Sequence, residues 1–420
     1  MNMRHWPDYN DKNPDKALQE LCSFAWARRN EPQDSPLRER VAAELKVISE
    51  LGYARMFLFL YTTATVQALA RYAVCACGAL AGSATAYLLG VSGINPLEHG
   101  LHFERFIHSR QKSPPTPALE TSANGYSEII SALHRKISLN LGALYHRTSL
   151  NQVGVIHDQS WDYVYLSSVN IRLLCKADWE QNKKMFDGKN LRLDIDWAEA
   201  DKLGMLCMAI RKSKMLTALV DALNDLHFTK RPALSRISLT DAKTYEFLNN
   251  TNADALFALR EYAHTKGKRP DIQNFAELTA FLALDALHEA KKRSLYYSKT
   301  TNYSISQEDF PVYQKHLHET RGILLYEEQF MDIVAEISGL PREDAFAAYQ
   351  AAWKRKLPKV DAWKQRFIAG ALANGYSADD ISPILDELFF AAREGLSPKA
   401  YFVGQAMQLY RLAYCIAHYG

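Results

Sequence analysis

Two aspartates that alternate along an extended chain can hold a pair of divalent cations. Asp194 and Asp196 have this spacing, inside the run Leu191–Asp196, whose pattern predicts a strand. Hard cations such as Mg²⁺ take oxygen ligands, and carboxylates supply them. A D-x-D motif among 47 acidic residues is a weak signal, however. Structural or solvated carboxylates are the alternative, because acidic side chains are mostly exposed.

A second segment mixes cations with aromatic side chains. From Trp353 to Arg366, six lysines and arginines are interleaved with two tryptophans. Cations neutralise backbone phosphates and aromatic rings stack on bases, so this mixture is typical of nucleic-acid binding. The candidate DNA-binding residues are Lys354, Arg355, Lys356, Lys364, Arg366, Trp353 and Trp363. The alternative is a solvated helix end whose tryptophans turn into the core.

Histidines and cysteines give weaker signals. His99 and His102 lie one helical turn apart and His108 follows, but no further ligand motif supports a metal site. Structural histidines are the better interpretation. Cys75 and Cys77 alternate in an apolar run, which favours buried, inert thiols. We predict no metal site here, and the sequence alone does not assemble a serine or cysteine nucleophile arrangement.

Composition narrows the class of protein. The 420 residues are 48% hydrophobic and 23% charged, which excludes a disordered, collagenous or disulfide-scaffold chain. Fifty basic minus 47 acidic residues give a net charge of +3, so any nucleic-acid footprint must be local. A small cluster at Arg211, Lys212 and Lys214 favours a solvated face. The six cysteines lack zinc spacing and no signal peptide precedes the chain, so we expect a cytoplasmic protein.

One apolar run could place the chain in a membrane. Tyr72–Val91 carries no charge over about the length that spans a bilayer, and Gly78 and Gly82 form a G-x-x-x-G motif. The run is rich in Gly, Ala, Ser and Thr rather than Leu and Ile, and one side of it carries no pattern of aromatic and cationic anchors. We therefore predict a buried glycine turn that opens a helix, and no membrane span.

Hydrophobic periodicity divides the chain into a mixed part and a helical part. Helical spacing recurs over Asp15–Arg29, Leu37–Gly52 and Met56–Ala70, whereas β-branched and aromatic runs between 154 and 196 predict strands. Ser113–Glu120 holds three prolines in five positions, which predicts a loop or an edge strand because proline cannot donate a ladder hydrogen bond. A helix is predicted over Lys214–Leu226, and from Leu239 onward the signal is helical.

Several motifs in a fixed order resemble one family. They are Glu39–Tyr53, Ala81–Val91, Asn95–Phe106, Gly322–Ile333, Trp353–Pro358, Lys364–Arg366 and a final Ala417–Tyr419. In this order they resemble the C-family polymerases, which comprise the alpha subunit of bacterial DNA polymerase III and its error-prone relatives. The chain is similar to a degenerate and truncated member, because the family carries further modules before and after this region.

The resemblance implies an α+β fold. A nucleotidyltransferase-like palm with a reduced thumb would occupy 37–235, after an N-terminal lead-in over 1–36. An all-helical fingers domain would occupy 236–420.

The resemblance also implies a reaction centre that this sequence lacks. Polymerases of this kind use two divalent ions held by aspartates. Counting from the motifs, those aspartates fall at Thr116, Ala118 and Ala209, none of which carries a carboxylate. The family's triphosphate-binding Gly-Arg-Gly-Ser loop is replaced by Ala76–Ala79, and its remnant is Gly78, Gly82 and Ser83.

Three functions follow as hypotheses. The first is a non-catalytic DNA-binding or scaffold module of DNA replication or damage tolerance, with primed or single-stranded DNA and replication or repair proteins as partners and no cofactor. The second is an active DNA-directed DNA polymerase that uses displaced carboxylates, Glu120, Asp194 and Asp196, with Mg²⁺. The third is a degraded paralogue of a mobile element, folded but without a retained role.

Overall fold

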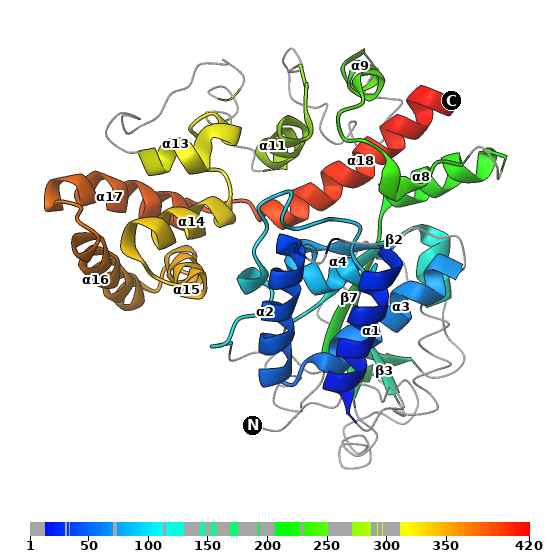
Figure 1. The fold of residues 1–420 in the computed structure, drawn as a ribbon, viewed down its shortest axis with the longest axis horizontal. Coiled ribbons are helices and arrows are strands. Elements are labelled where there is room, and N and C mark those ends of the chain that lie inside the picture. The colour runs from blue at the N-terminus through cyan, green and yellow to red at the C-terminus, as the bar shows by residue number, and fades with distance from the viewer. Residues whose placement is uncertain are drawn as a thin grey trace. The chain divides into compact units, whose positions relative to one another are not determined.

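The chain forms two compact units. Unit 1 comprises Met1–Glu98 and Gln111–Arg231, and unit 2 comprises His99–Arg110 and Pro232–Gly420. The computed structural model describes residues 13–29, 32, 34–69, 74–111, 115–129, 143–147, 153–156, 169–174, 192–193, 206–227, 231–250, 271–286, 292, 296 and 311–420 (Figure 1). The predicted bounds 1–36, 37–235 and 236–420 stay predictions. The short segment 99–110 belongs to the helical unit although the chain on both sides of it belongs to unit 1.

Helices begin unit 1. They are α1 (Pro14–Arg29), α2 (Pro36–Glu50), α3 (Ala54–Leu69) and, further on, α4 (Ala84–Leu88) and α8 (Lys214–Asp225). Ser35 caps α2 by accepting a hydrogen bond from the Leu37 backbone N–H, and Pro36 stands at the first helical position, where its missing N–H costs nothing. Ser213 caps α8 in the same way, through the N–H of Leu216. These starts agree with the helices that the sequence predicts.

A mixed sheet forms the rest of unit 1. Its strands are β1 (Val74–Cys77), β2 (Ala118–Thr121), β3 (Ala143–Arg147), β4 (Val153–Ile156), β5 (Val169–Leu174), β6 (Arg192–Leu193) and β7 (Leu206–Lys212). Within the described residues the order is β1-β2-β7-β5-β3-β4-β6. Only the β2–β7 pair is parallel among these neighbours, and the other pairs are antiparallel. Helices and a sheet together make the chain an α+β protein.

The prediction for the proline-rich segment is wrong over its last residues. We expected loop or edge structure throughout Ser113–Glu120, but β2 begins at Ala118 and lies between β1 and β7. The prolines end one residue earlier, at Pro117, so every strand residue keeps its N–H group. Pro117 still takes part through its carbonyl, which accepts the Ala209 N–H at 2.9 Å.

The apolar run is a turn and a helix, as the sequence predicts. After the unpredicted strand β1, a 3₁₀ turn runs over Gly78–Gly82 and α4 follows. Gly78 opens the turn at φ +61°, a backbone conformation that favours glycine. Among the helices that the structure describes, none is long and apolar enough to cross a membrane.

Unit 2 is helical in the part described. Its helices are α9 (Ala242–Asn250), α11 (Phe275–Ala286), α13 (Pro311–Leu317), α14 (Glu327–Ser338), α15 (Arg342–Trp353), α16 (Leu357–Ala373), α17 (Ala378–Glu394) and α18 (Lys399–Tyr419), with short 3₁₀ turns at Phe103–Arg105, Leu234–Arg236 and His318–Thr320. Ser377 and Asp380 form a capping box at the start of α17. Gly339 ends α14 at φ +68°.

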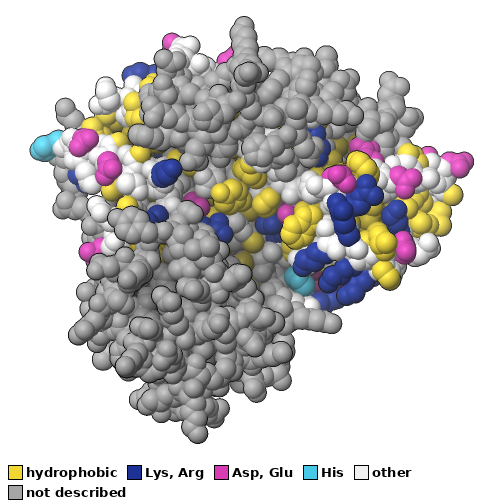
Figure 2. Space-filling view, turned by 180° about the vertical axis from the view of Figure 1, so that it is seen from behind, with side chains coloured by type: hydrophobic (Ala, Val, Ile, Leu, Met, Phe, Trp, Pro, Cys, Tyr) yellow, Lys and Arg dark blue, Asp and Glu magenta, His cyan; other side chains and the backbone are white. Residues whose placement is uncertain are grey.

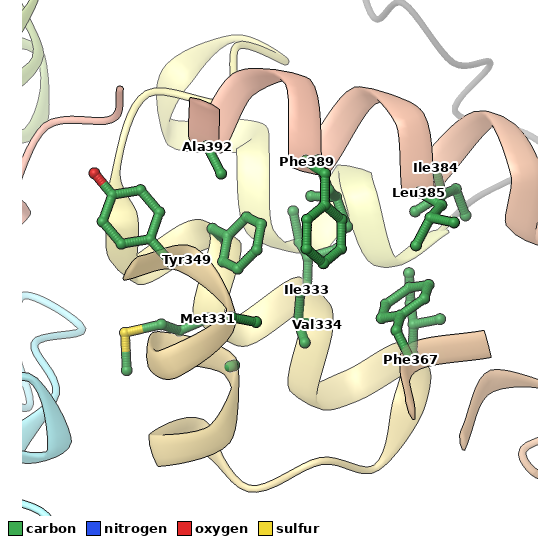
Figure 3. Packing of buried hydrophobic residues seen from close by; sticks show 14 of the residues in the cluster. Met331, Ile333, Val334, Tyr349, Phe367, Ile384, Leu385, Phe389 and Ala392 are labelled. Atoms are coloured by element: carbon green, nitrogen blue, oxygen red, sulfur yellow. The ribbon is translucent and has the colours of Figure 1, made fainter. Parts of the chain in front are cut away.

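One apolar cluster holds α13–α17 together. Phe330 on α14 is fully buried and packs edge-on against Phe389 of α17, with ring centres 5.9 Å apart. Phe367 brings α16 into the same cluster (Figure 3). This core fixes the turn between α15 and α16 that carries the candidate cations.

Candidate functional site

The positions counted for the family's metal ligands come together on two adjacent strands. Ala118 on β2 is the Cα partner of Ala209 on β7. Thr116 is exposed, two residues before Ala118. Ala209 is 3% exposed, so its methyl group is buried. The structure therefore brings these positions together, and the side chains there are two methyl groups and a hydroxyl.

Glu120 lies beside these positions in a buried polar cluster. Side chains alternate along a strand, so Glu120 shares a face of β2 with Ala118. Its carboxylate is 5% exposed and accepts a hydrogen bond from the Cys77 thiol at 3.1 Å. Arg211 is the Cα partner of Glu120 on β7, and its guanidinium lies 3.7 Å from the Cys77 sulfur. The face that would hold cations in the family therefore already holds a guanidinium.

The Cys77 thiol in this cluster is a poor nucleophile. Burial, and after it the neighbouring Glu120 charge, raise the pKa of Cys77 well above its ordinary value. A thiol with a raised pKa stays protonated and is a poor nucleophile. Cys75, two residues earlier in β1, is also buried and forms no disulfide. Both thiols are therefore buried as the sequence predicts.

The glycine-loop remnant is occupied by a carboxylate of the chain itself. Ser83 caps α4 and donates its hydroxyl to Glu44 at 2.8 Å. The backbone N–H groups of Ala84 and Thr85 donate to the same carboxylate at 2.8 and 2.9 Å. Glu44 is 1% exposed, and burial raises its pKa although Arg40 and these N–H groups act in the opposite direction. The N–H groups at this helix start are thus paired within the chain.

The remaining fallback residues lie outside the described part of the chain. Asp194 and Asp196 follow β6 directly, and β6 is at the end of the sheet order away from β1 and β2. In the residues that are described, no group of three or more His, Cys, Asp and Glu side chains is placed to hold a metal ion.

The histidines of segment 99–110 are built into unit 2. His102 Nε2 lies 3.0 Å from Asp332 Oδ2. His99 packs its ring 5.1 Å from that of Phe275, and burial together with the Lys399 charge lowers its pKa to about 4. Both imidazole rings therefore contact other side chains of unit 2.

The cationic segment splits into two groups of residues. Lys354, Arg355 and Lys356 are exposed in the turn between α15 and α16, and Lys359 follows on α16. None of these four makes an ion pair with a described residue. We call them the basic turn. Figure 2 shows Lys and Arg side chains gathered among apolar side chains on this part of unit 2.

The other two predicted cations are already paired. Arg366 donates to Asp344 at 2.6 Å and stacks 4.3 Å from the ring centre of Trp363. Lys364 lies 3.7 Å from Asp386. Trp363 packs against the apolar cluster of α13–α17. Trp353, by contrast, is 54% exposed at the end of α15. Trp363 therefore packs against the core, as one alternative has it, and Trp353 is exposed, as the other requires.

Nothing in the sequence predicted the groove that lies beside the basic turn. It lies against α16 and α17, has a volume of about 560 Å³ and includes Arg355, Leu357 and Lys364 in its lining. Its rim carries Phe390, which is 59% exposed. An exposed Phe in an amphipathic helix gives no sequence signal of its own. Only the neighbouring basic turn could have drawn attention to it.

Comparisons with known proteins agree with the motif order. Residues 16–144 match the model of the bacterial DNA polymerase III alpha NTPase domain, and residues 214–375 match that of the bacterial DNA polymerase III alpha subunit finger domain. The chain belongs to the bacterial DNA polymerase III alpha family. The segment 99–110, which joins unit 2, lies inside the first of the two family matches.

Individual relatives extend the match over most of the chain. DNA polymerase III subunit alpha of Halalkalibacterium halodurans is 24% identical over 98% of this chain and 42% of its own length. The Thermus aquaticus subunit is 22% identical over 81% of this chain and 34% of its own length. The Staphylococcus epidermidis subunit is 21% identical over 93% of this chain. The chain thus spans between 34% and 42% of the length of these relatives.

Proposed function

We propose that the chain is a non-catalytic DNA-binding or scaffold module of DNA replication or damage tolerance, built from a nucleotidyltransferase-like palm and helical fingers. The observation that carries the proposal is the pairing of Ala118 with Ala209 across β2 and β7. Two-metal phosphoryl transfer needs carboxylates at such adjoining positions. A methyl group cannot replace a carboxylate as a ligand for Mg²⁺.

The surroundings of Glu120 support the same conclusion. Its carboxylate already accepts a hydrogen bond from the Cys77 thiol, and Arg211 faces it across the strand pair. A divalent cation there would be repelled by the guanidinium and would have to displace the thiol. The residues present do not fit a metal pair, so we assign no cofactor.

The competing function is a polymerase with displaced carboxylates. One observation favours it: Glu120 lies in β2 itself, on the face of the strand that Ala118 occupies. Asp194 and Asp196 would then have to complete the set with Mg²⁺. The two functions make opposite predictions for nucleotide incorporation.

DNA binding is assigned to unit 2. The four cations of the basic turn have no ion-pair partner among the described residues, so their charge is available to phosphates. Trp353 is exposed beside them and offers a stacking surface. We propose primed or single-stranded DNA as the ligand, replication or repair proteins as further partners, and the cytoplasm as the location.

Primer extension and DNA binding on one preparation test the proposal. We expect the chain to bind primed DNA and to incorporate no nucleotide with Mg²⁺ or Mn²⁺. Extension that Glu120→Gln or Asp194→Asn abolishes, and that the exposed control Glu20→Gln retains, would overturn the non-catalytic assignment and establish the displaced-carboxylate polymerase. Absence of DNA binding at moderate salt would leave a scaffold that acts through protein contacts.

A further inference from the structure

The groove between α16 and α17 is close to neutral in charge and apolar in part. Its cations are Arg355, Lys364 and Arg393, and its acids are Asp361, Asp386 and Glu387. Leu357, Val360 and Phe389 add apolar surface. A neutral, partly apolar groove suits an uncharged planar group better than a phosphate, because the three acids offset the attraction of the three cations for an anion.

An aromatic platform stands at the rim of this groove. Phe390 exposes 59% of its surface, and the guanidinium of Arg393 lies 5.0 Å from the centre of its ring. This cation–π contact supports the ring in its exposed position. Leu357, 67% exposed on α16, adds a second apolar side chain. Large exposed apolar groups that cluster at a groove mark an interaction site.

The basic turn adjoins the groove, because Arg355 belongs to both. Arg355 lines the groove and stands in the turn at φ +52°, a conformation that residues with a Cβ rarely adopt. Lys354 and Lys356 flank it and are exposed. Cations with no ion-pair partner among the described residues, next to a neutral groove with an aromatic rim, match the two parts of a nucleotide, a charged phosphate and an uncharged base.

We propose that this groove receives an unpaired base of a single nucleic-acid strand, stacked on Phe390, while the basic turn holds the adjoining phosphates. The inference rests on the proposed DNA binding and makes it selective for unpaired strands. A duplex keeps its bases stacked on each other, so it can reach the basic turn but cannot fill the groove. Phe390 and Arg393 are then part of the DNA-binding surface.

Fluorescence anisotropy with a labelled oligo-dT strand and a matched duplex tests the proposal on the full chain. Phe390→Ala should weaken single-strand binding roughly 5- to 150-fold, the loss expected for one stacked base, and leave the salt dependence unchanged. Duplex binding should not change. Phe390→Trp keeps an aromatic face and should retain single-strand binding. Phe24→Ala is the matched control, because Phe24 is 63% exposed on α1 in unit 1.

The outcomes separate the inference from the proposed function. If the wild-type chain binds no single strand, the proposed DNA binding fails and the inference fails with it. If the wild-type chain binds but Phe390→Ala behaves as Phe24→Ala does, the inference alone is overturned. A change in oligomeric state without a change in DNA binding would identify the groove as a protein contact and would also overturn it.

Discussion

Arg105 Nε donates to Glu327 Oε2 at 2.5 Å inside unit 2, and the two side chains are only 12% and 9% exposed. The pair joins segment 99–110 to the start of α14. Both residues stand in motifs that carry the family resemblance, Asn95–Phe106 and Gly322–Ile333. The two charges neutralise each other inside unit 2. A chain can therefore need these motifs for folding, whether or not it catalyses a reaction.

Removal of Arg105 should therefore destabilise unit 2 strongly. Arg105→Met leaves the buried Glu327 carboxylate without its cation, which we expect to cost about 3–5 kcal/mol. The matched control is Arg393→Met, because the Arg393–Glu394 pair is about half exposed on both sides and such pairs contribute about 1 kcal/mol or less. Urea unfolding followed by circular dichroism measures both. Equal losses in the two variants would contradict a structural role for the buried pair.

Replacing both partners gives a second test. Arg105→Met combined with Glu327→Met removes both buried charges, and apolar replacement of a buried pair is often neutral. We expect the double variant to recover part of the stability that Arg105→Met loses. A double variant that is less stable than Arg105→Met would show that another contact of Glu327 dominates.

The stability of unit 2 should depend on pH through His99. Burial and Lys399 lower the pKa of His99 to about 4, from an ordinary value near 6.5. The folded state therefore binds fewer protons than the unfolded state between these values, and stability falls as pH falls from about 6.5 to about 4. His99→Phe should flatten this part of the stability profile. The exposed His318→Asn is the control, and an equal flattening in both variants would contradict the assignment to His99.

Periodicity and turn chemistry predicted the helices well. The Ser377 capping box and the Lys214 helix start are local features, so a window of residues contains the signals that produce them. The strand β2 was missed because its place in the sheet depends on β7, about 90 residues further along the chain. Proline density misled because only the residues inside the strand need their N–H groups.

The candidate site was predictable only where a motif fixed the count. Ala118 and Ala209 were located from motif spacing, and the structure makes them cross-strand partners. The split within the cationic segment was not predictable, because Asp344 and Asp386, which pair Arg366 and Lys364, come from neighbouring helices. The role of Phe390 was not predictable for the same reason. The groove that Phe390 lines is also lined by Arg355, which stands in the turn between α15 and α16.

Glu44 should be essential for the start of α4. Glu44→Ala leaves the Ser83 hydroxyl and the N–H groups of Ala84 and Thr85 buried without their acceptor. Each lost partner costs about 1–3 kcal/mol, so we expect unit 1 to lose at least about 3 kcal/mol. Glu39→Ala removes an exposed carboxylate from α2, the helix that also carries Glu44, and should hardly change the stability. Thermal unfolding compares the two variants. Similar melting temperatures would contradict a stabilising role of Glu44 at the start of α4.

Affinity for single-stranded DNA should depend on the basic turn more than on Lys364 and Arg366. Replacing Lys354, Arg355 and Lys356 together by Gln removes three cations that have no ion-pair partner in the described chain. Each phosphate contact contributes about 0.7 to the slope of log K against log salt for single strands, so the slope should fall by about 2. Replacing Lys364 and Arg366 by Gln should change it less, because both already neutralise a carboxylate.

A matched charge control separates a local contact from a general effect of net charge. Lys16, Arg28 and Lys243 are exposed and remote in sequence from the basic turn, and their triple Gln variant has the same net charge as the basic-turn variant. We expect it to bind oligo-dT with nearly the wild-type salt slope. If both triple variants lose slope equally, the strand is attracted by the charge of the whole chain and the basic turn is an ordinary solvated helix end. If only the basic-turn variant loses it, the phosphates are held between α15 and α16.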